Sequence, residues 1–279
     1  MKKVLVLTDL SDKAAHAAEV ALKIAERLKA NLILFNAFPV VEAFPVTGVG
    51  MWPIDDFAAH ENDSKYGLSL LAENLKKLSG ANGFHPQITF RNAMGNFGSV
   101  VGDLLKEAEP DLIVMGGKGA DKLGHFFIGS ESNMVLRIAN CPVLFIPETY
   151  SYMNISKIVF ADDLERVRPS SVHFLTDLAR SYNAEIILTH ITNSEDEAKL
   201  GFKGCINTIT KNYNYPNATN KCIIGKDIKT TLLEIPDLLQ ADLFVMIHHR
   251  LSFLNRLFAG SMTKHVLKRK QVPLLVLPG

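Results

Sequence analysis

The sequence predicts an α/β fold in which two tandem domains each form a five-stranded parallel sheet. Three observations support this fold. Short apolar runs typical of buried strands alternate with longer segments that have the apolar spacing of amphipathic helices. The motifs of the first half of the chain return in the second half. Glycine-rich turns follow a buried strand, at the end of the sheet where α/β folds bind their ligands.

The composition is that of a globular protein and argues against several classes of function. The chain has 279 residues, which suffices for two domains, with 47% hydrophobic and 21% charged residues. A net charge of +1 gives no support for a nucleic-acid or membrane partner, and no apolar run approaches a membrane span. The three cysteines lack metal-ligand spacing, and the first residues lack the apolar core of a signal peptide. We therefore predict a cytoplasmic protein without a metal site.

Strands and helices alternate in the first copy, as a parallel sheet with right-handed crossovers requires. Ser11 is the expected N-cap of the first helix, and Asp12 complements the dipole of that helix. The expected strands are 3–8, 31–37, 87–93, 111–116 and 142–146, and the expected helices are 12–29, 61–79, 98–108 and 130–139.

An internal repeat divides the chain into two predicted domains, 1–150 and 151–279. Residues 111–115 match 242–246, and Gly129-Ser130 matches Gly260-Ser261, in both cases 131 positions apart. At the starts of the copies, residues 4–9 align with 157–162, so that Asp162 corresponds to Asp9. The extra residues of the first copy form a predicted loop from Phe38 to His60. The strands expected in the second copy are 157–161, 185–190, 219–224, 242–247 and 273–277.

Two glycine clusters are candidates for contact with phosphate. Gly116-Gly117-Lys118-Gly119 follows a buried strand, and Gly129-Ser130 opens a helix. Unpaired amides at a helix start attract anions, and glycine lets an anion approach the backbone closely. The alternative is that these glycines only satisfy turn geometry. The spacing matches neither a Walker A loop nor the Gly-x-Gly-x-x-Gly dinucleotide motif.

Three motifs together resemble the universal stress protein family in its tandem, two-domain form. They are Thr8-Asp9-x-Ser11, Gly116-x2-Gly119-x9-Gly129-Ser130 and Cys141-Pro142-Val143-Leu144. The resemblance implies Rossmann-like (adenine nucleotide alpha hydrolase-like) domains with strand order 3-2-1-4-5. It also implies an adenine nucleotide, ATP or AMP, as the ligand. The strand order reverses between strands 1 and 4, so Asp9 and Gly116 are expected at one crevice.

The resemblance also implies which residues bind the nucleotide in the first copy. The Asp9 carboxylate faces the nucleoside, the Ala37 backbone meets adenine, and the glycine motif lines ribose and phosphates. The predicted nucleotide-binding residues are Thr8, Asp9, Ala37, Met115, Gly116, Gly119, Gly129, Ser130, Glu131 and Ser132. Taken alone, Asp9 is better explained as a helix-entry acid that complements the helix dipole; the glycine pattern shifts the interpretation to nucleotide contact.

Glu131 departs from the family pattern, which usually has a small apolar residue at that position. A carboxylate there suits the bare helix dipole but repels a triphosphate. Four interpretations stay open: the side chain points away, it acts through a divalent cation such as Mg²⁺ bound with ATP, the site favours AMP, or this copy holds no nucleotide.

The second copy is expected to have lost the nucleotide site. Ile247-His248-His249-Arg250 replaces Gly116 to Gly119, so side chains fill the space where backbone would meet ribose and phosphate. Adjacent histidines of an extended segment point to opposite sides, which favours a structural role over a metal site. We expect Arg250 to fill the vacant phosphate region beside Asp162.

The predicted function is a stress-responsive, nucleotide-binding sensor rather than an enzyme. Bound nucleotide would order the 38–60 loop, and an unknown protein partner would read that loop. The alternatives are a slow ATP hydrolase that uses Asp9 or Glu131, and an interaction protein that binds no nucleotide. Fifth strands lie at sheet edges, so 142–146 and 273–277 are expected to pair within the chain as a pseudo-dimer, and homodimerisation is compatible with the sequence.

Overall fold

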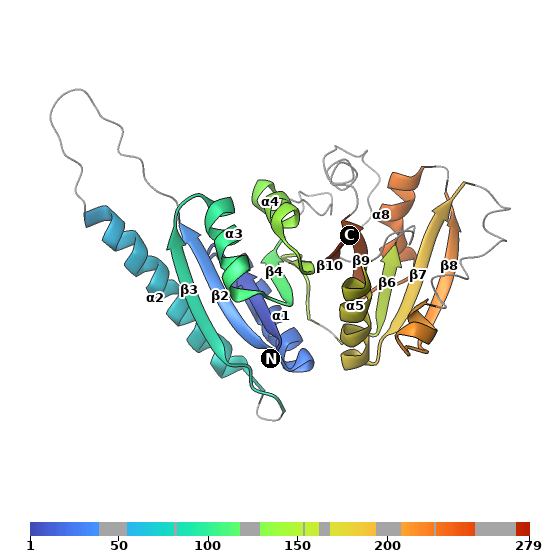
Figure 1. The fold of residues 1–279 in the computed structure, drawn as a ribbon, viewed down its shortest axis with the longest axis horizontal. Coiled ribbons are helices and arrows are strands. Elements are labelled where there is room, and N and C mark those ends of the chain that lie inside the picture. Colours follow the sequence, from blue (N-terminus) through green and yellow to red (C-terminus); the bar gives the residue numbers. More distant parts are fainter. Residues whose placement is uncertain are drawn as a thin grey trace, which may run out of the picture. The chain divides into compact units, whose positions relative to one another are not determined.

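The computed structural model describes residues 1–38, 55–80, 83–117, 129–152, 154–161, 168–193, 208–225, 227–248 and 272–279. The chain divides into two compact units, Met1–Gly116 and Gly117–Gly279 (Figure 1). The second unit begins before residue 150 because a strand of residues 117–150 pairs with the last strand of the chain. The domain boundary drawn from the repeat stays a prediction.

Within its described residues, the first unit forms four parallel strands in the order β3-β2-β1-β4. The bounds are β1 Lys3–Leu7, β2 Asn31–Phe38, β3 Ile88–Met94 and β4 Leu112–Gly116. This is the predicted order for strands 1 to 4. All of Val4–Leu7 is buried, which explains why this strand is a continuous apolar run rather than an alternating one.

The described residues of the first unit also form three helices: α1 (Asp12–Leu28), α2 (Asp55–Leu78) and α3 (Phe97–Ala108). Ser11 is the N-cap of α1, as predicted, and its Oγ accepts a hydrogen bond from Ala14 N at 3.3 Å. The expected start of α2 at residue 61 was wrong. The helix already includes residues 55–60. Residues 39–54, the rest of the predicted loop, lie outside the described residues.

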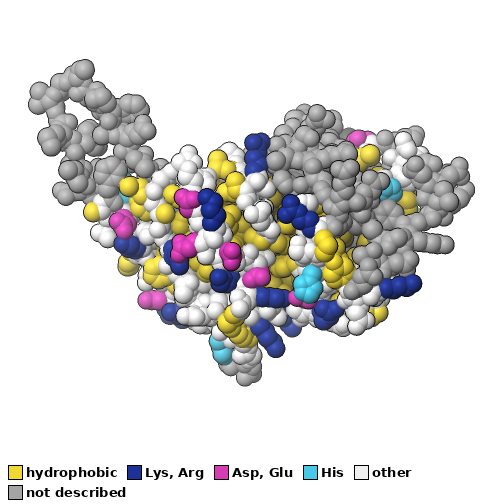
Figure 2. All heavy atoms as spheres, in the orientation of Figure 1, with side chains coloured by type: hydrophobic (Ala, Val, Ile, Leu, Met, Phe, Trp, Pro, Cys, Tyr) yellow, Lys and Arg dark blue, Asp and Glu magenta, His cyan; other side chains and the backbone are white. Residues whose placement is uncertain are grey.

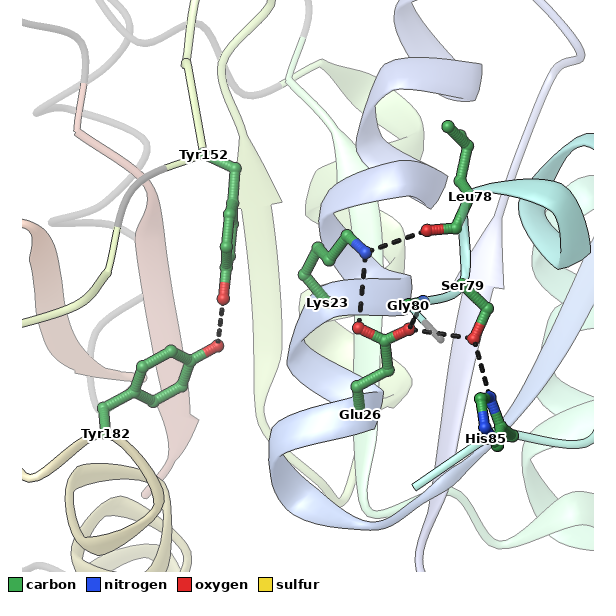
Figure 3. A network of polar contacts seen from close by, with 8 residues as sticks. All are labelled: Lys23, Glu26, Leu78, Ser79, Gly80, His85, Tyr152 and Tyr182. Atoms are coloured by element: carbon green, nitrogen blue, oxygen red, sulfur yellow. Dashed lines mark hydrogen bonds and ion pairs between the residues drawn. The ribbon is translucent and has the colours of Figure 1, made fainter. Parts of the chain in front are cut away.

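The end of α2 is held to α1 by a polar network (Figure 3). The Glu26 carboxylate accepts hydrogen bonds from Ser79 Oγ at 3.0 Å and from Gly80 N at 3.2 Å. Lys23 Nζ donates to the Leu78 carbonyl at 3.0 Å and lies 3.4 Å from Glu26 Oε2. One carboxylate therefore satisfies backbone and side-chain donors where α2 ends.

In the second unit, the part of the chain that the structure describes forms six strands in the order β5-β10-β9-β6-β7-β8. Its strands are β5 (Val143–Ile146), β6 (Lys157–Ala161), β7 (Glu185–Thr192), β8 (Ala218–Ile224), β9 (Leu243–His248) and β10 (Leu274–Pro278). The helical segments among its described residues are α4 (Ser130–Ile138), α5 (Pro169–Tyr182), the π-helical turn η1 (Thr208–Asn212) and α8 (Ile228–Leu238).

The strands of the second copy confirm the complete predicted order. Read from β8, they run β8-β7-β6-β9-β10, which is 3-2-1-4-5 when numbered from the start of the copy. β10 also pairs antiparallel with β5, with Leu275 opposite Leu144. The predicted pairing of the two fifth strands within one chain is thus confirmed.

The strand register corrects the alignment of the two copies by one residue. The equivalent residues follow from their neighbours on both sides: Leu7 is opposite Phe35 and Met115, and Ala161 is opposite Thr189 and Met246. Leu7 and Ala161 are 154 positions apart, whereas the sequence alignment used 153. Runs that are apolar at every position still match when they are shifted by one, so hydrophobicity did not fix the register.

This correction changes the counterpart of Asp9 from Asp162 to Asp163. Both residues lie outside the described part of the chain, as do His249, Arg250, Gly260 and Ser261. The predicted contact between Arg250 and Asp162 therefore stays a prediction.

The described surface mixes charges of both signs. On the face shown in Figure 2, Lys and Arg side chains lie among Asp and Glu side chains, in keeping with the net charge of +1. Within the described residues, no helix has the length and apolarity needed to cross a membrane.

Replacing Glu26 with Ala should lower the free energy of unfolding by about 1–2 kcal/mol, because Gly80 N and Ser79 Oγ lose their acceptor. Glu19→Ala, an exposed change on the same helix, is the control for helix propensity. Urea denaturation of both variants measures the difference. Equal stability of the two variants would show that the network does not hold α2.

Candidate functional site

The carboxyl ends of β1, β2 and β4 bring five of the predicted site residues to one edge of the first sheet. Leu7 is paired with Phe35 on one side and with Met115 on the other. Four further predicted residues follow these positions along their strands: Thr8, Asp9, Ala37 and Gly116. Thr8 and Met115 are buried, whereas Asp9 is exposed.

The ladder of backbone hydrogen bonds between β1 and β2 stops at Thr8. Beyond it, side chains bond to the backbone groups that the next ladder bonds would have paired. Thr8 N donates to the Phe35 carbonyl at 2.9 Å, the last regular rung. In a continued parallel ladder, Ala37 N would donate to the Thr8 carbonyl, and Leu10 N to the Ala37 carbonyl. Instead, Asn36 Nδ2 donates to the Thr8 carbonyl at 2.8 Å. Leu10 N donates to Thr8 Oγ1 at 3.0 Å.

These replacements leave the main chain of Ala37 available. Alternate residues of β2 direct their backbone groups to opposite neighbours. Phe35 bonds toward β1, whereas Phe38 accepts from Gly95 N beyond β3. Ala37 lies two residues after Phe35, so its N–H and C=O point toward the β1 side of the strand, beyond the point where β1 ends. Within the described residues, neither group has a hydrogen-bond partner. The site thus presents a donor and an acceptor side by side.

The Asp9 carboxylate is fixed by one oxygen and open at the other. Its Oδ1 accepts hydrogen bonds from Ser11 N at 3.0 Å and from Ser11 Oγ at 2.5 Å. Its Oδ2 accepts none from the described residues. Asp9 therefore supports the start of α1, as the helix-entry interpretation requires, and also offers an oriented acceptor to solvent.

Leu10 adopts a backbone conformation that bulky residues rarely take. Its φ is +63°, in the left-handed region, which costs roughly 1–2 kcal/mol for a residue with a Cβ. The Leu10 side chain packs against Gly67 of α2, where an added Cβ would lie 2.7 Å from Leu10 Cδ1. The missing side chain at Gly67 therefore makes room for Leu10, and α2 helps to hold the β1–α1 loop.

Gly116 has a packing role that the sequence did not reveal. An added Cβ would lie 3.4 Å from the Lys13 carbonyl oxygen and 3.7 Å from Ala14 Cα. These are van der Waals distances, so Gly116 lies directly against the first turn of α1. In the second copy, the buried side chain of Ile247 stands at the equivalent position. This difference supports the prediction that the second copy lacks the site.

The other predicted residues belong to the second unit or lie outside the described residues. Gly129 is the N-cap of α4 and has no side-chain capping bond. In the first turn of α4, Ser130 and Glu131 are exposed and Ser132 is buried. All four belong to the second unit, and Gly119 lies outside the described residues. The start of α4, considered by itself, offers backbone amides to an anion.

Two contributors were missed by the sequence analysis. Asn36 is 7% exposed, and its Oδ1 accepts a hydrogen bond from Ser64 Oγ of α2 at 2.8 Å; Ser64 is 4% exposed. A polar residue within the apolar run of β2 was the available signal for Asn36. No sequence pattern pointed to Ser64.

Replacing Ser11 with Ala should lower the free energy of unfolding by about 1 kcal/mol, because the N-cap and the partner of Asp9 are both lost. Ser99→Ala, an exposed change within α3, controls for the substitution itself. Thermal unfolding compares the two variants. If Ser11→Ala unfolds at the same temperature as Ser99→Ala, the loop is not held as described.

Comparison with known proteins gives a consistent result. The model of the universal stress protein family matches residues 1–147 and 213–278. Universal stress protein YxiE of Bacillus subtilis is 30% identical over 147 residues, which are 52% of this chain and 97% of that protein. Universal stress protein Sll1654 of Synechocystis is 29% identical over 146 residues, 52% of this chain and 85% of that protein. Each relative thus matches about half of this chain.

A solved structure extends the comparison to the whole fold. The crystal structure of a universal stress protein from Archaeoglobus fulgidus aligns with a TM-score of 0.74 at 14% identity. The alignment covers 99% of this chain and 98% of the other. The chain is therefore a tandem member of the universal stress protein family.

Proposed function

We propose that this protein is a regulatory sensor that binds an adenine nucleotide, ATP or AMP, at the carboxyl ends of β1, β2 and β4. The main chain of Ala37 is the observation that carries the proposal. Its N–H and C=O face past Thr8 and are left without partners within the described residues. Adenine presents an acceptor, N1, beside a donor, the N6 amino group, so the two edges match as a hydrogen-bonded pair.

The Asp9 carboxylate supplies the second element of the proposed site. Ser11 fixes Oδ1, which orients Oδ2 toward solvent as a charged acceptor. Ribose hydroxyl groups are donors, and hydrogen bonds to a charged acceptor are stronger than neutral ones. The base, in contrast, is expected to pair with the uncharged main chain of β2. In this proposal, Asp9 binds the sugar and Ala37 binds the base.

The start of α4 has the properties expected of a phosphate-binding helix end. Gly129 has no side chain to cap α4, so the amides of its first turn lack a side-chain acceptor at the N-cap. Exposed Glu131 in the same turn is suited to a triphosphate only together with a divalent cation. We therefore propose that this helix end, considered by itself, suits the phosphate of AMP, or of ATP together with Mg²⁺.

We propose binding without turnover, in the cytoplasm, with the nucleotide state read by a protein partner. Such a sensor requires the ligand to bind two states of the protein with different affinities. The loop that carries Asp9 is linked to α2 through the Leu10–Gly67 contact. This link connects the site to a helix whose outer side carries the exposed residues Tyr66 and Leu70.

Isothermal titration calorimetry with AMP, ADP and ATP tests the proposal. The wild-type chain should bind at least one of them, and Asp9→Ala should weaken binding by about 10- to 100-fold, because a hydrogen bond to a charged group is lost. Asp12→Ala, in the first turn of α1, is the matched control and should bind almost as tightly as wild type.

Other results would favour the other functions. No affinity for any adenine nucleotide at millimolar concentration would support an interaction protein without nucleotide. Steady release of phosphate from ATP that is lost in Asp9→Ala would support a slow hydrolase.

A further inference from the structure

We propose that Asn36 is a positioning residue that keeps the main chain of Ala37 free for the base, and that Ser64 of α2 holds Asn36 in this role. The proposal rests on the nucleotide site proposed above. It goes further by assigning base selectivity to two buried side chains that do not themselves touch the base. The pair lies in the interior, since Asn36 is 7% and Ser64 4% exposed.

The first step concerns the carbonyl of Thr8, which lies in a buried residue and needs a donor. Two donors compete for it. The main-chain N–H of Ala37 is the donor of a regular parallel ladder, and the side-chain amide of Asn36 is the donor that the structure shows, at 2.8 Å. As long as Asn36 satisfies Thr8, the N–H of Ala37 stays available.

The second step concerns the orientation of the Asn36 amide. A carbonyl oxygen only accepts hydrogen bonds, so the Asn36 atom facing Thr8 must be Nδ2. The Asn36 oxygen then faces α2, where Ser64 Oγ donates to it at 2.8 Å. Ser64 thus satisfies the buried amide oxygen. The Thr8 carbonyl itself excludes the flipped amide, which would place two oxygens against each other.

The third step makes α2 part of the site. Ser64 and Gly67 are three residues apart and therefore share one side of the helix. Ser64 holds β2 through Asn36, and Gly67 receives Leu10 from the β1–α1 loop. The far end of α2 is fixed to α1 by Glu26. The helix therefore fixes both segments from which base and sugar contacts come.

The consequence is discrimination between purine bases. Guanine presents a donor at N1 and an acceptor at O6, the reverse of adenine along the same edge. A free N–H and C=O at Ala37 pair with adenine and oppose guanine. If Ala37 N–H returned to the ladder, the acceptor N1 of adenine would lose its partner, and the preference for adenine would fall.

Asn36→Leu tests the inference, with titration of AMP and GMP and with amide hydrogen exchange of Ala37 in the nucleotide-free protein. The preference for AMP over GMP should fall by about tenfold, the equivalent of one hydrogen bond. The Ala37 amide should exchange more slowly in the variant, because it takes the place of Asn36 as donor to Thr8. A variant that is merely less stable would exchange faster and lose affinity for both nucleotides alike.

Ser64→Ala is the milder second variant and Ser69→Ala, on the same helix, is its matched control. Ser64→Ala should lower the AMP preference in the same direction, and Ser69→Ala should leave it unchanged. A preference that is unchanged in both Asn36→Leu and Ser64→Ala, in a wild-type protein that binds AMP, would overturn this inference and leave the proposed function intact. A wild-type protein that binds neither nucleotide would overturn both.

Discussion

The point at which the ladder between β1 and β2 ends determines the rest of the candidate site. Backbone groups inside a sheet need partners, and a parallel pair of strands normally continues until the chain turns away. Here the side chains of Asn36 and Thr8 satisfy the groups that the ladder would have used. The hydrogen bond from Asn36 to the Thr8 carbonyl is therefore the contact on which the availability of Ala37 depends.

The neighbouring helices α1 and α2 hold the segments at the end of the β1–β2 ladder in place. Ser11 starts α1 and fixes Asp9, so the first turn of the helix and the carboxylate are parts of one arrangement. Leu10 accepts an unfavourable backbone conformation because its side chain gains a place beside Gly67. Strain of this kind is typical of functional loops, and α2 is the element that stabilises it.

Local sequence patterns predicted the framework well because each depends on near neighbours. Continuous apolar runs predicted the strands, and Ser11 predicted the start of α1. The patterns did not predict features that depend on residues far apart in the sequence. The apolar run of β6 matches β1 in two registers, and only its pairing with β7 and β9 shows which is correct. Ser64 reaches Asn36 across 28 positions, which no spacing rule indicates.

The two copies provide a comparison within one chain. The sheet order is the same in the parts that can be compared, but Ile247 has a buried side chain at the position where Gly116 lies against the first turn of α1. The strand framework is thus retained while the end of strand 4 has changed. This difference accords with a fold that depends on buried apolar strands and a site that depends on a few residues at their ends.

The most direct test of the central claim is a titration of the ¹⁵N-labelled protein with AMP, followed by amide chemical shifts. The account predicts a large shift for the Ala37 amide, with smaller shifts for Asp9 and Leu10. It predicts no shift for Ile191, which occupies the position of Ala37 in the second copy. An Ala37 amide that does not move at saturating AMP, or equal shifts at Ala37 and Ile191, would contradict the account.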